Sequence, residues 1–171
     1  MLYNSMWKEI SKYFRDYPKR QIIAQKMLEY GLCVNGNKLY CGEIELSDSK
    51  VARAFNADRR AIAATIQTIN KHSDLQSLFS NLLPTCHLKQ AASEMKWGVV
   101  EIIPKDPSIP GIIAEVAGII SKYKISIRQA IVDDFELSEE PRLFIVTETE
   151  IPSDLLPKLR KAKGVKALLI Y

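Results

Sequence analysis

Several features of secreted and membrane proteins are missing from this sequence of 171 residues. The chain does not open with a basic segment followed by an apolar core, which is the pattern of a secretory signal. Its most apolar run, residues 111–120, has about half the length needed to span a bilayer. From these absences we expect a cytoplasmic, unprocessed protein that does not enter a membrane.

Cysteine is also scarce, and its placement excludes two kinds of cross-link. The three cysteines, Cys33, Cys41 and Cys86, are odd in number and widely spaced, so they form neither a disulfide framework nor a Cys-x-x-Cys zinc site. Cys86 is followed by His87, but adjacent residues lack the spacing of a pair of metal ligands. We therefore expect no metal site.

The sequence has no recognisable catalytic set. His72 and His87 have no evident carboxylate partner in the sequence, and no serine or cysteine lies in a nucleophile motif. A glycine-rich phosphate loop is absent as well. We expect a protein that is not an enzyme and needs no cofactor, although an amino-acid effector is compatible with the features below.

Composition and charge point to a globular protein with two different halves. Apolar residues make up 47% and charged residues 26% of the chain, as in soluble globular proteins. Residues 1–96 hold 14 Lys plus Arg against 9 Asp plus Glu, a net charge of +5, whereas residues 97–171 hold 10 against 11, a net charge of −1. The basic excess of the first half is compatible with a polyanion partner.

The first half reads as mostly helical. A helix is predicted over residues 4–17, capped by Asn4 or Ser5 and ended by Pro18, and a second over residues 19–30, ended by Gly31. The inner face of the second helix is expected to be Ile22, Ile23, the stem of Lys26, Met27 and Tyr30. Between short β-prone runs, the dipeptide at residues 35–36 is Asn-Gly, which indicates a hairpin.

Residues 47–71 predict a helix-turn-helix. Ser47 or Asp48 can cap a helix that ends at Phe55, and Asp58 can cap another that ends near Lys71. In the intervening turn Asn56 stands where glycine is usual, and asparagine also tolerates a left-handed conformation. The packing sides are expected to be Val51, Ala52 and Phe55 on one helix and Ile62, Ile66 and Ile69 on the other.

The opposite side of the second helix is basic, small and amide-bearing, as a major-groove reader requires. Two alanines would allow close approach, the arginines can reach phosphate or guanine, and the glutamine can reach a base edge. An ordinary solvent-facing helix has similar residues, so the alternative stays open. The candidate contacts with double-stranded DNA are Arg59, Arg60, Ala63, Ala64, Gln67 and Lys71.

A connector with helical segments, residues 73–96, is expected to pack on the first domain, and a different pattern starts at Trp97. Strands are predicted at residues 99–103, 125–134, 143–150 and 165–171, with helices at 111–123 and 153–163. This βαββαβ order predicts a ferredoxin-like antiparallel sheet with both helices on one face. The fold class is therefore α+β, with a helix-turn-helix domain over residues 1–96 and a second domain over residues 97–171. In that second domain, the helix residues expected to bury against the sheet are Ile112, Val116, Ile119, Leu155 and Leu159.

The second half resembles the ACT domain, a ligand-sensing module of amino-acid metabolism, and in particular that of phosphoglycerate dehydrogenase. The resemblance rests on Asp106, on Pro-Gly-Ile at residues 110–112, on Ile-Ser-Ile at residues 125–127 and on Gly-Val at residues 164–165. It implies that two modules pair and bind an effector amino acid between them. The positions at which those enzyme domains have asparagine hold Ser108 and Ser126 here.

The chemistry of the Pro-Gly turn fits a carboxylate. Gly111 has no side chain, so the backbone N–H groups at the start of the following helix are open, and the helix dipole favours an anion there. A turn that merely connects a strand to a helix is the alternative. The candidate ligand-binding residues are Asp106, Ser108, Pro110, Gly111, Ile112, Ile113, Ile125, Ser126 and Ile127.

RNA-recognition modules share this strand order. They stack bases on aromatic residues of the third strand. Residues 143–150, LFIVTETE, offer one aromatic residue followed by acids, which argues against RNA binding.

A helix-turn-helix followed by an ACT module resembles a family of archaeal proteins predicted to regulate amino-acid metabolism. The resemblance implies a transcriptional regulator that forms a homodimer or higher homo-oligomer through its ACT domains. Such a protein binds a small amino acid and double-stranded DNA. The alternative is a regulatory subunit of an amino-acid biosynthetic enzyme, whose N-terminal half docks on protein. The two readings differ in what Arg59, Arg60 and Gln67 contact.

Overall fold

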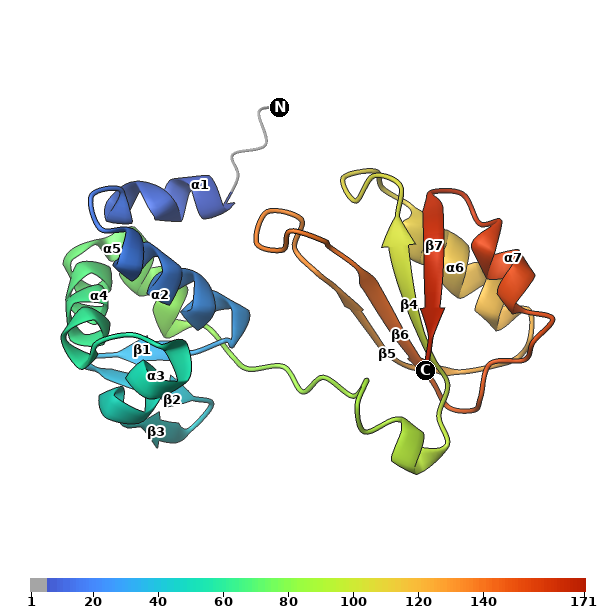
Figure 1. Cartoon of the computed structure of the whole chain (residues 1–171), viewed down its shortest axis with the longest axis horizontal. Helices are drawn as coiled ribbons and strands as arrows, with labels where there is room; N and C mark the ends of the chain where they lie inside the picture. The colour runs from blue at the N-terminus through green and yellow to red at the C-terminus, as the bar shows by residue number, and fades with distance from the viewer. Residues whose placement is uncertain (1–5) are drawn as a thin grey trace. The chain divides into compact units, whose positions relative to one another are not determined.

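The computed structural model describes residues 6–171, so the predicted cap at Asn4 or Ser5 lies outside the described residues. The chain divides into two compact units, one that runs to Cys86 and one from His87 to Tyr171 (Figure 1). The elements of the N-terminal unit are α1 (Met6–Ser11), a short 3-10 helix (Lys12–Phe14), α2 (Pro18–Glu29), β1 (Cys33–Asn35), β2 (Lys38–Cys41), β3 (Ile44–Leu46), α3 (Asp48–Phe55), α4 (Arg59–Lys71) and α5 (Ser73–Ser80).

The two predicted N-terminal helices form, with differences at their junction. The first is broken into α1 and a 3-10 turn, and Pro18 begins α2, because proline suits the first position of a helix. Gly31 ends this segment in the left-handed conformation, at φ 60°. The predicted inner face was partly wrong: Ile22 and Tyr30 are 54% and 62% exposed, and the buried residues are Ile23, Ala24 and Met27.

The predicted hairpin is part of a three-stranded antiparallel sheet in the order β1-β2-β3. Asn35 pairs with Lys38, so the turn itself is formed by Gly36 and Asn37, one residue later than the Asn-Gly signal. Gly36 has φ 55°, which glycine adopts without strain. The side-chain amide of Asn70 in α4 donates to the Gly36 carbonyl at 2.7 Å, which ties this turn to the helix.

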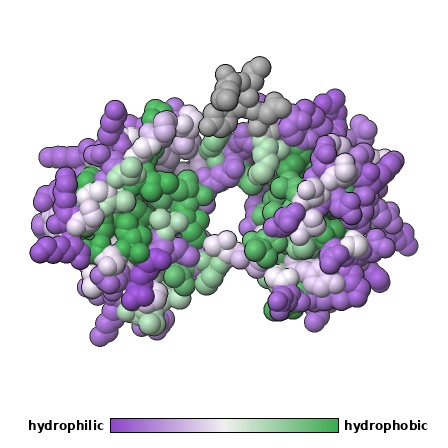
Figure 2. Space-filling model, turned by 180° about the vertical axis from the view of Figure 1, so that it is seen from behind, coloured by the Kyte–Doolittle hydropathy of each residue, from purple (hydrophilic) through white to green (hydrophobic). Residues whose placement is uncertain are grey.

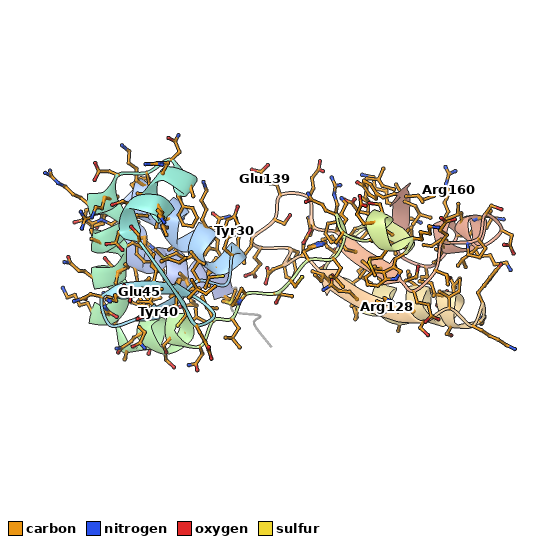
Figure 3. The ribbon with its side chains drawn as sticks, turned by 90° about the horizontal axis from the view of Figure 1, so that it is seen from below. Tyr30, Tyr40, Glu45, Arg128, Glu139 and Arg160 are labelled. Carbon is orange, nitrogen blue, oxygen red and sulfur yellow. The ribbon has the colours of Figure 1, made fainter. Side chains whose placement is uncertain are left out.

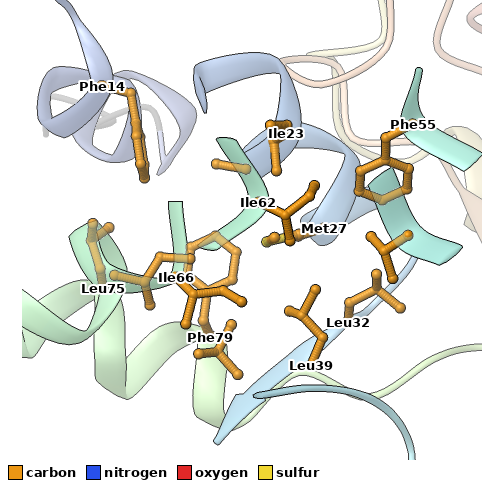
Figure 4. Packing of buried hydrophobic residues seen from close by; sticks show 14 of the residues in the cluster. Phe14, Ile23, Met27, Leu32, Leu39, Phe55, Ile62, Ile66, Leu75 and Phe79 are labelled. Carbon is orange, nitrogen blue, oxygen red and sulfur yellow. The ribbon is translucent and has the colours of Figure 1, made fainter. Parts of the chain in front are cut away.

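One apolar core holds the N-terminal unit together. α4 lies at its centre, and Ile62, Ile66 and Ile69 are at most 1% exposed. Figure 4 shows Ile62 and Ile66 among side chains from α2, α5 and the sheet. As predicted, α3 contributes the buried residues Val51, Ala52 and Phe55. α5 adds Leu75 and Phe79 to the core.

The C-terminal unit has the predicted order of strands and helices. It consists of β4 (Val99–Pro104), α6 (Ile112–Ser121), β5 (Ile127–Val132), β6 (Leu143–Thr147), α7 (Leu156–Arg160) and β7 (Val165–Ile170), preceded by a short 3-10 helix (Ser93–Met95). The strands form one antiparallel sheet in the order β5-β6-β4-β7, so β5 and β7 are its edges (Figure 1). This connectivity is ferredoxin-like.

The two helices bury their apolar residues against one face of the sheet. Val116, Leu155 and Leu159 are fully buried, as predicted. Ile112 and Ile119 are only partly buried at the margin of this core, and Ile120 takes the deeper position. α7 is shorter than predicted and begins at Leu156 rather than at Ser153 or Asp154.

The end of the connector differs from the prediction. We expected residues 73–96 to pack on the first domain, but residues 87–96 belong to the second unit. Leu88 and Ala92 pack with Trp97 against Val99 and Val146, on the face of the sheet that the helices leave uncovered. We call residues 87–97 the strap.

Candidate functional sites

The predicted DNA-reading face of α4 is presented to solvent. Arg59, Arg60, Gln67 and Lys71 are exposed, and Ala63 and Ala64 are partly exposed. The opposite side is the isoleucine row of the core. Because one side of the helix is fixed by burial, the other can face only outward, with four long polar side chains around two short ones.

The start of α4 is held by specific hydrogen bonds. Asp58 caps the helix, since its Oδ1 accepts from the Arg60 N–H at 2.6 Å. Asn56 adopts φ 52° and ψ 49°, the left-handed conformation predicted for the turn. Lys26 of α2 donates to the Phe55 carbonyl at 3.3 Å, at the end of α3. These contacts fix the position from which Arg59 and Arg60 extend.

A shallow hollow of about 640 Å³ lies beside the start of α4. Arg60, Ala61 and Ala64 line one side, and residues 16–20, at the start of α2, line the other. There the Arg20 guanidinium lies 4.0 Å from the centre of the Tyr17 ring. Sequence reasoning did not connect residues 16–20 with α4, because only the tertiary fold brings them together.

In the C-terminal unit, Asp106 and Ser108 bond to each other in the loop before α6. The Asp106 Oδ1 atom accepts from the Ser108 hydroxyl at 2.6 Å and from its N–H at 2.9 Å. Both bonds lower the pKa of Asp106, and the bond from the hydroxyl has the larger effect. The two side chains therefore stabilise the shape of the loop.

The loop ends at Gly111, the N-cap of α6, with φ 101°. No side chain caps the helix there. Glu115 N–H bonds the Gly111 carbonyl at 3.0 Å, and the preceding N–H groups of the first turn have no acceptor within the helix. The amides expected to receive an anion are thus left open.

A cavity of about 410 Å³ lies beside this helix start. Four of the predicted ligand-binding residues line it: Pro110, Gly111, Ile112 and Ile113. The far wall includes Asp133 and Arg142, which sequence reasoning missed. They adjoin the acidic loop that follows β5, and their place became evident only when β5 and β6 were paired, because Asp133 N–H bonds the Arg142 carbonyl at 2.9 Å.

Ile125, Ser126 and Ile127 lie elsewhere in the unit. They precede or begin β5, whereas Val132, at the other end of that strand, lines the cavity. At about 3.3 Å per residue the two ends of β5 are about 16 Å apart. Figure 3 likewise shows Arg128 near the start of β5 far from Glu139 on the following loop. At the start of the strand the Ser126 N–H donates to the Glu148 carboxylate at 3.1 Å. Because the two ends of β5 are this far apart, one copy of the chain does not bring all nine predicted residues together.

A buried carboxylate organises the face of the sheet under the strap. Glu101 of β4 is 1% exposed. It accepts from Lys89 at 2.8 Å, from the Tyr171 hydroxyl at 2.6 Å and from Arg142. Burial raises the pKa of Glu101, but these three bonds outweigh burial and hold the pKa at about 2. The Lys89 ammonium also lies 4.0 Å from the centre of the Tyr171 ring.

Residues 6–171 contain no group of three or more side chains suited to hold a metal ion. Within the same residues the cysteines form no disulfide; Cys33 and Cys41 are partly buried and Cys86 is exposed. Within the same range, no helix is both long and apolar enough to cross a bilayer.

Comparison with known proteins gives distant likenesses to solved structures. No protein-family model matches the chain, and no curated protein does. The ACT domain of a GTP pyrophosphokinase from Chlorobium tepidum is 21% identical over 44% of this chain and 84% of that chain, with a TM-score of 0.32. The protein PH0061 is 12% identical over 90% of both chains, with a TM-score of 0.27. These scores are too low to establish a family.

Proposed function

We propose that this protein is a regulator of amino-acid metabolism that binds double-stranded DNA through α4 and a small amino acid through a pair of C-terminal units. The observation that carries the DNA-binding part is the exposed side of α4, where four long polar side chains surround two alanines. A helix with this side free can enter a major groove about 12 Å wide.

Charge supports the same assignment. The unit that runs to Cys86 holds 12 Lys plus Arg and 8 Asp plus Glu, a net charge of +4, whereas residues 87–171 hold 12 of each. All the excess positive charge of the chain is therefore in the unit that carries α4. Contacts from Arg59, Arg60 and Lys71 to phosphates would give binding that weakens as salt rises.

The amino-acid site is proposed at the cavity beside Gly111. Open amides and the helix dipole favour a carboxylate there. A cavity of about 410 Å³ falls within the size range of small-molecule sites.

Pairing of two chains would complete this site. β5 is an edge strand, and two copies of an edge strand that pair across a two-fold axis perpendicular to the sheet run antiparallel. The start of one β5 then lies beside the end of the other. In such a pair Ser126 of the partner subunit would come to the cavity bounded by Val132 and Gly111, and the predicted residues would form one site from two chains.

The outer side of α6 supports pairing as well. A Cβ atom placed on Gly118 would meet nothing within 4 Å, so a second copy could approach this side of the helix closely. Figure 2 shows hydrophobic residues gathered on one face of the C-terminal unit. An exposed hydrophobic face suits contact with a second copy.

Binding to duplex DNA at several salt concentrations tests the proposal. We expect affinity to fall steeply with salt, and the double variant Arg59→Ala/Arg60→Ala to weaken binding and flatten the salt dependence. The control is Lys161→Ala/Lys163→Ala, which removes the same charge from exposed positions of the other unit. Equal effects of the two double variants would show that α4 is not the DNA-binding element and would favour the regulatory-subunit alternative.

A further inference from the structure

The cavity beside the start of α6 has apolar walls. Ile102 and Leu143 form its floor from the central strands, and Ile112 and Ile113 border it from α6. Ile109 of the loop and Val132 of β5 stand at its rim, 50% and 54% exposed. A ligand without an apolar part would leave these surfaces in contact with water, so the walls favour a hydrocarbon side chain.

Polar groups are confined to two places. The open amides at the start of α6 are donors, and Asp133 lies on the opposite wall. The Asp133 Oδ2 atom accepts from the Arg142 N–H at 3.1 Å. Burial raises the pKa of Asp133, which means that its charged form lacks solvation and would gain from a cation beside it.

The other charged residue of the lining, Arg142, is already engaged. Its Nη1 atom donates to Glu101, and its Nη2 atom donates to Glu140 at 2.7 Å. With both terminal nitrogens held by carboxylates, the guanidinium offers little to a second carboxylate on a ligand. An acidic side chain would therefore find no positive partner in this cavity.

We infer that the cavity selects α-amino acids with branched or aromatic apolar side chains. Their carboxylate would bind the amides after Gly111, their ammonium group would face Asp133, and their side chain would contact Ile112, Val132 and Leu143. This inference deepens the proposed function and rests on the carboxylate-binding role given there to α6.

Calorimetry and thermal-shift measurements on the full chain distinguish a failure of the apolar selectivity from a failure of the amino-acid site itself. We expect leucine, isoleucine and phenylalanine to bind at least about tenfold more tightly than glycine or serine, because apolar pockets discriminate by about that factor for each methylene group. Aspartate should not bind. If glycine and serine bind as tightly as leucine, the apolar selectivity is wrong while the amino-acid site stands. If none of the six binds, the proposed amino-acid site itself fails.

Two leucine analogues test the polar contacts. Isocaproate lacks the ammonium group and isoamylamine lacks the carboxylate, and both should bind at least about tenfold more weakly than leucine. Isocaproate that binds like leucine would remove the role of Asp133. Isoamylamine that binds like leucine would remove the role of the α6 amides, and with it the proposed carboxylate site.

A pair of matched variants tests the place of binding. Val132→Asp puts a charge on the cavity wall, and Ile170→Asp makes a similar change on the other edge strand, at a residue that is 52% exposed and lies outside the cavity. Both positions are exposed enough for the fold to tolerate the change. Val132→Asp should weaken leucine binding about tenfold or more, and Ile170→Asp should leave it unchanged. Equal effects, or none at Val132, would overturn the assignment.

Discussion

Lys89 of the strap and Glu101 of the central strand β4 form an ion pair of 2.8 Å on the face of the sheet opposite the helices. The carboxylate is buried, while the Lys89 side chain is 24% exposed. Arg142 and Tyr171 bond the same carboxylate, so a single charge joins the strap, the β5–β6 hairpin and the end of the chain. The strap follows directly after Cys86, the last residue of the N-terminal unit. Its attachment to β4 therefore makes it the first segment of the second unit.

Glu101→Gln should destabilise the C-terminal unit, because it leaves the Lys89 and Arg142 charges without their partner. The pKa of Glu101 is lowered to about 2, so its contribution is fully present above about pH 4.5 and is lost as the pH falls towards 2. We expect the variant to lose roughly 3 kcal/mol of unfolding free energy at pH 7 and less at pH 3. Urea unfolding at the two pH values measures this difference. The exposed Glu150→Gln serves as control, and a loss that does not shrink at pH 3 would contradict the linkage.

Asp58→Ala should shorten or loosen the start of α4. The side chain of Asp58 satisfies the Arg60 N–H, and loss of such a cap costs about 1 kcal/mol. Asn is an equally good cap, so Asp58→Asn should restore the stability measured by urea unfolding. If alanine and asparagine unfold at the same urea concentration, the cap does not stabilise the helix.

Gly111→Ala and Gly118→Ala should change stability in opposite directions. A Cβ atom at either position meets nothing within 4 Å, so backbone conformation decides the effect. Gly111 has φ 101°, which strains alanine, and we expect a loss of about 1 kcal/mol together with weaker ligand binding. Gly118 lies inside α6, where alanine is favoured by about 1 kcal/mol. Thermal unfolding of the two variants gives both signs, and equal signs would contradict the argument.

Gly118→Lys should weaken pairing without unfolding the unit. The substitution places a long charged side chain on the outer side of α6, and the position is open in a single copy of the chain. If two copies meet there, sedimentation should show a shift from dimer towards monomer, while Gly118→Ala stays associated. An unchanged dimer would place the pairing surface elsewhere.

Local sequence patterns correctly predicted the features that depend on a few neighbouring residues. The cap at Asp58, the left-handed Asn56 and the isoleucine row of α4 were predicted correctly, because a few neighbouring residues determine them. The inner face of α2 was predicted wrongly at Ile22 and Tyr30. Apolar character alone does not show which side of a helix meets its neighbours.

Distant contacts explain what sequence reasoning missed. Glu101 lies in an apolar run, and its partners are 12, 41 and 70 residues away along the chain. Asp133 and Arg142 line the cavity beside Gly111 only because β5 and β6 pair. For the same reason the strap was assigned to the wrong unit, since a short helical pattern does not reveal which sheet it covers.

The order of strands and helices, the open helix start at Gly111 and the polar side of α4 are properties of the sequence by itself, because hydrophobic periodicity and capping act over a few residues. Tertiary structure alone decided the walls of the cavity, the charge cluster around Glu101 and the separation of residues 125–127 from Gly111. Those features depend on strand order and register, which bring together residues far apart in the chain.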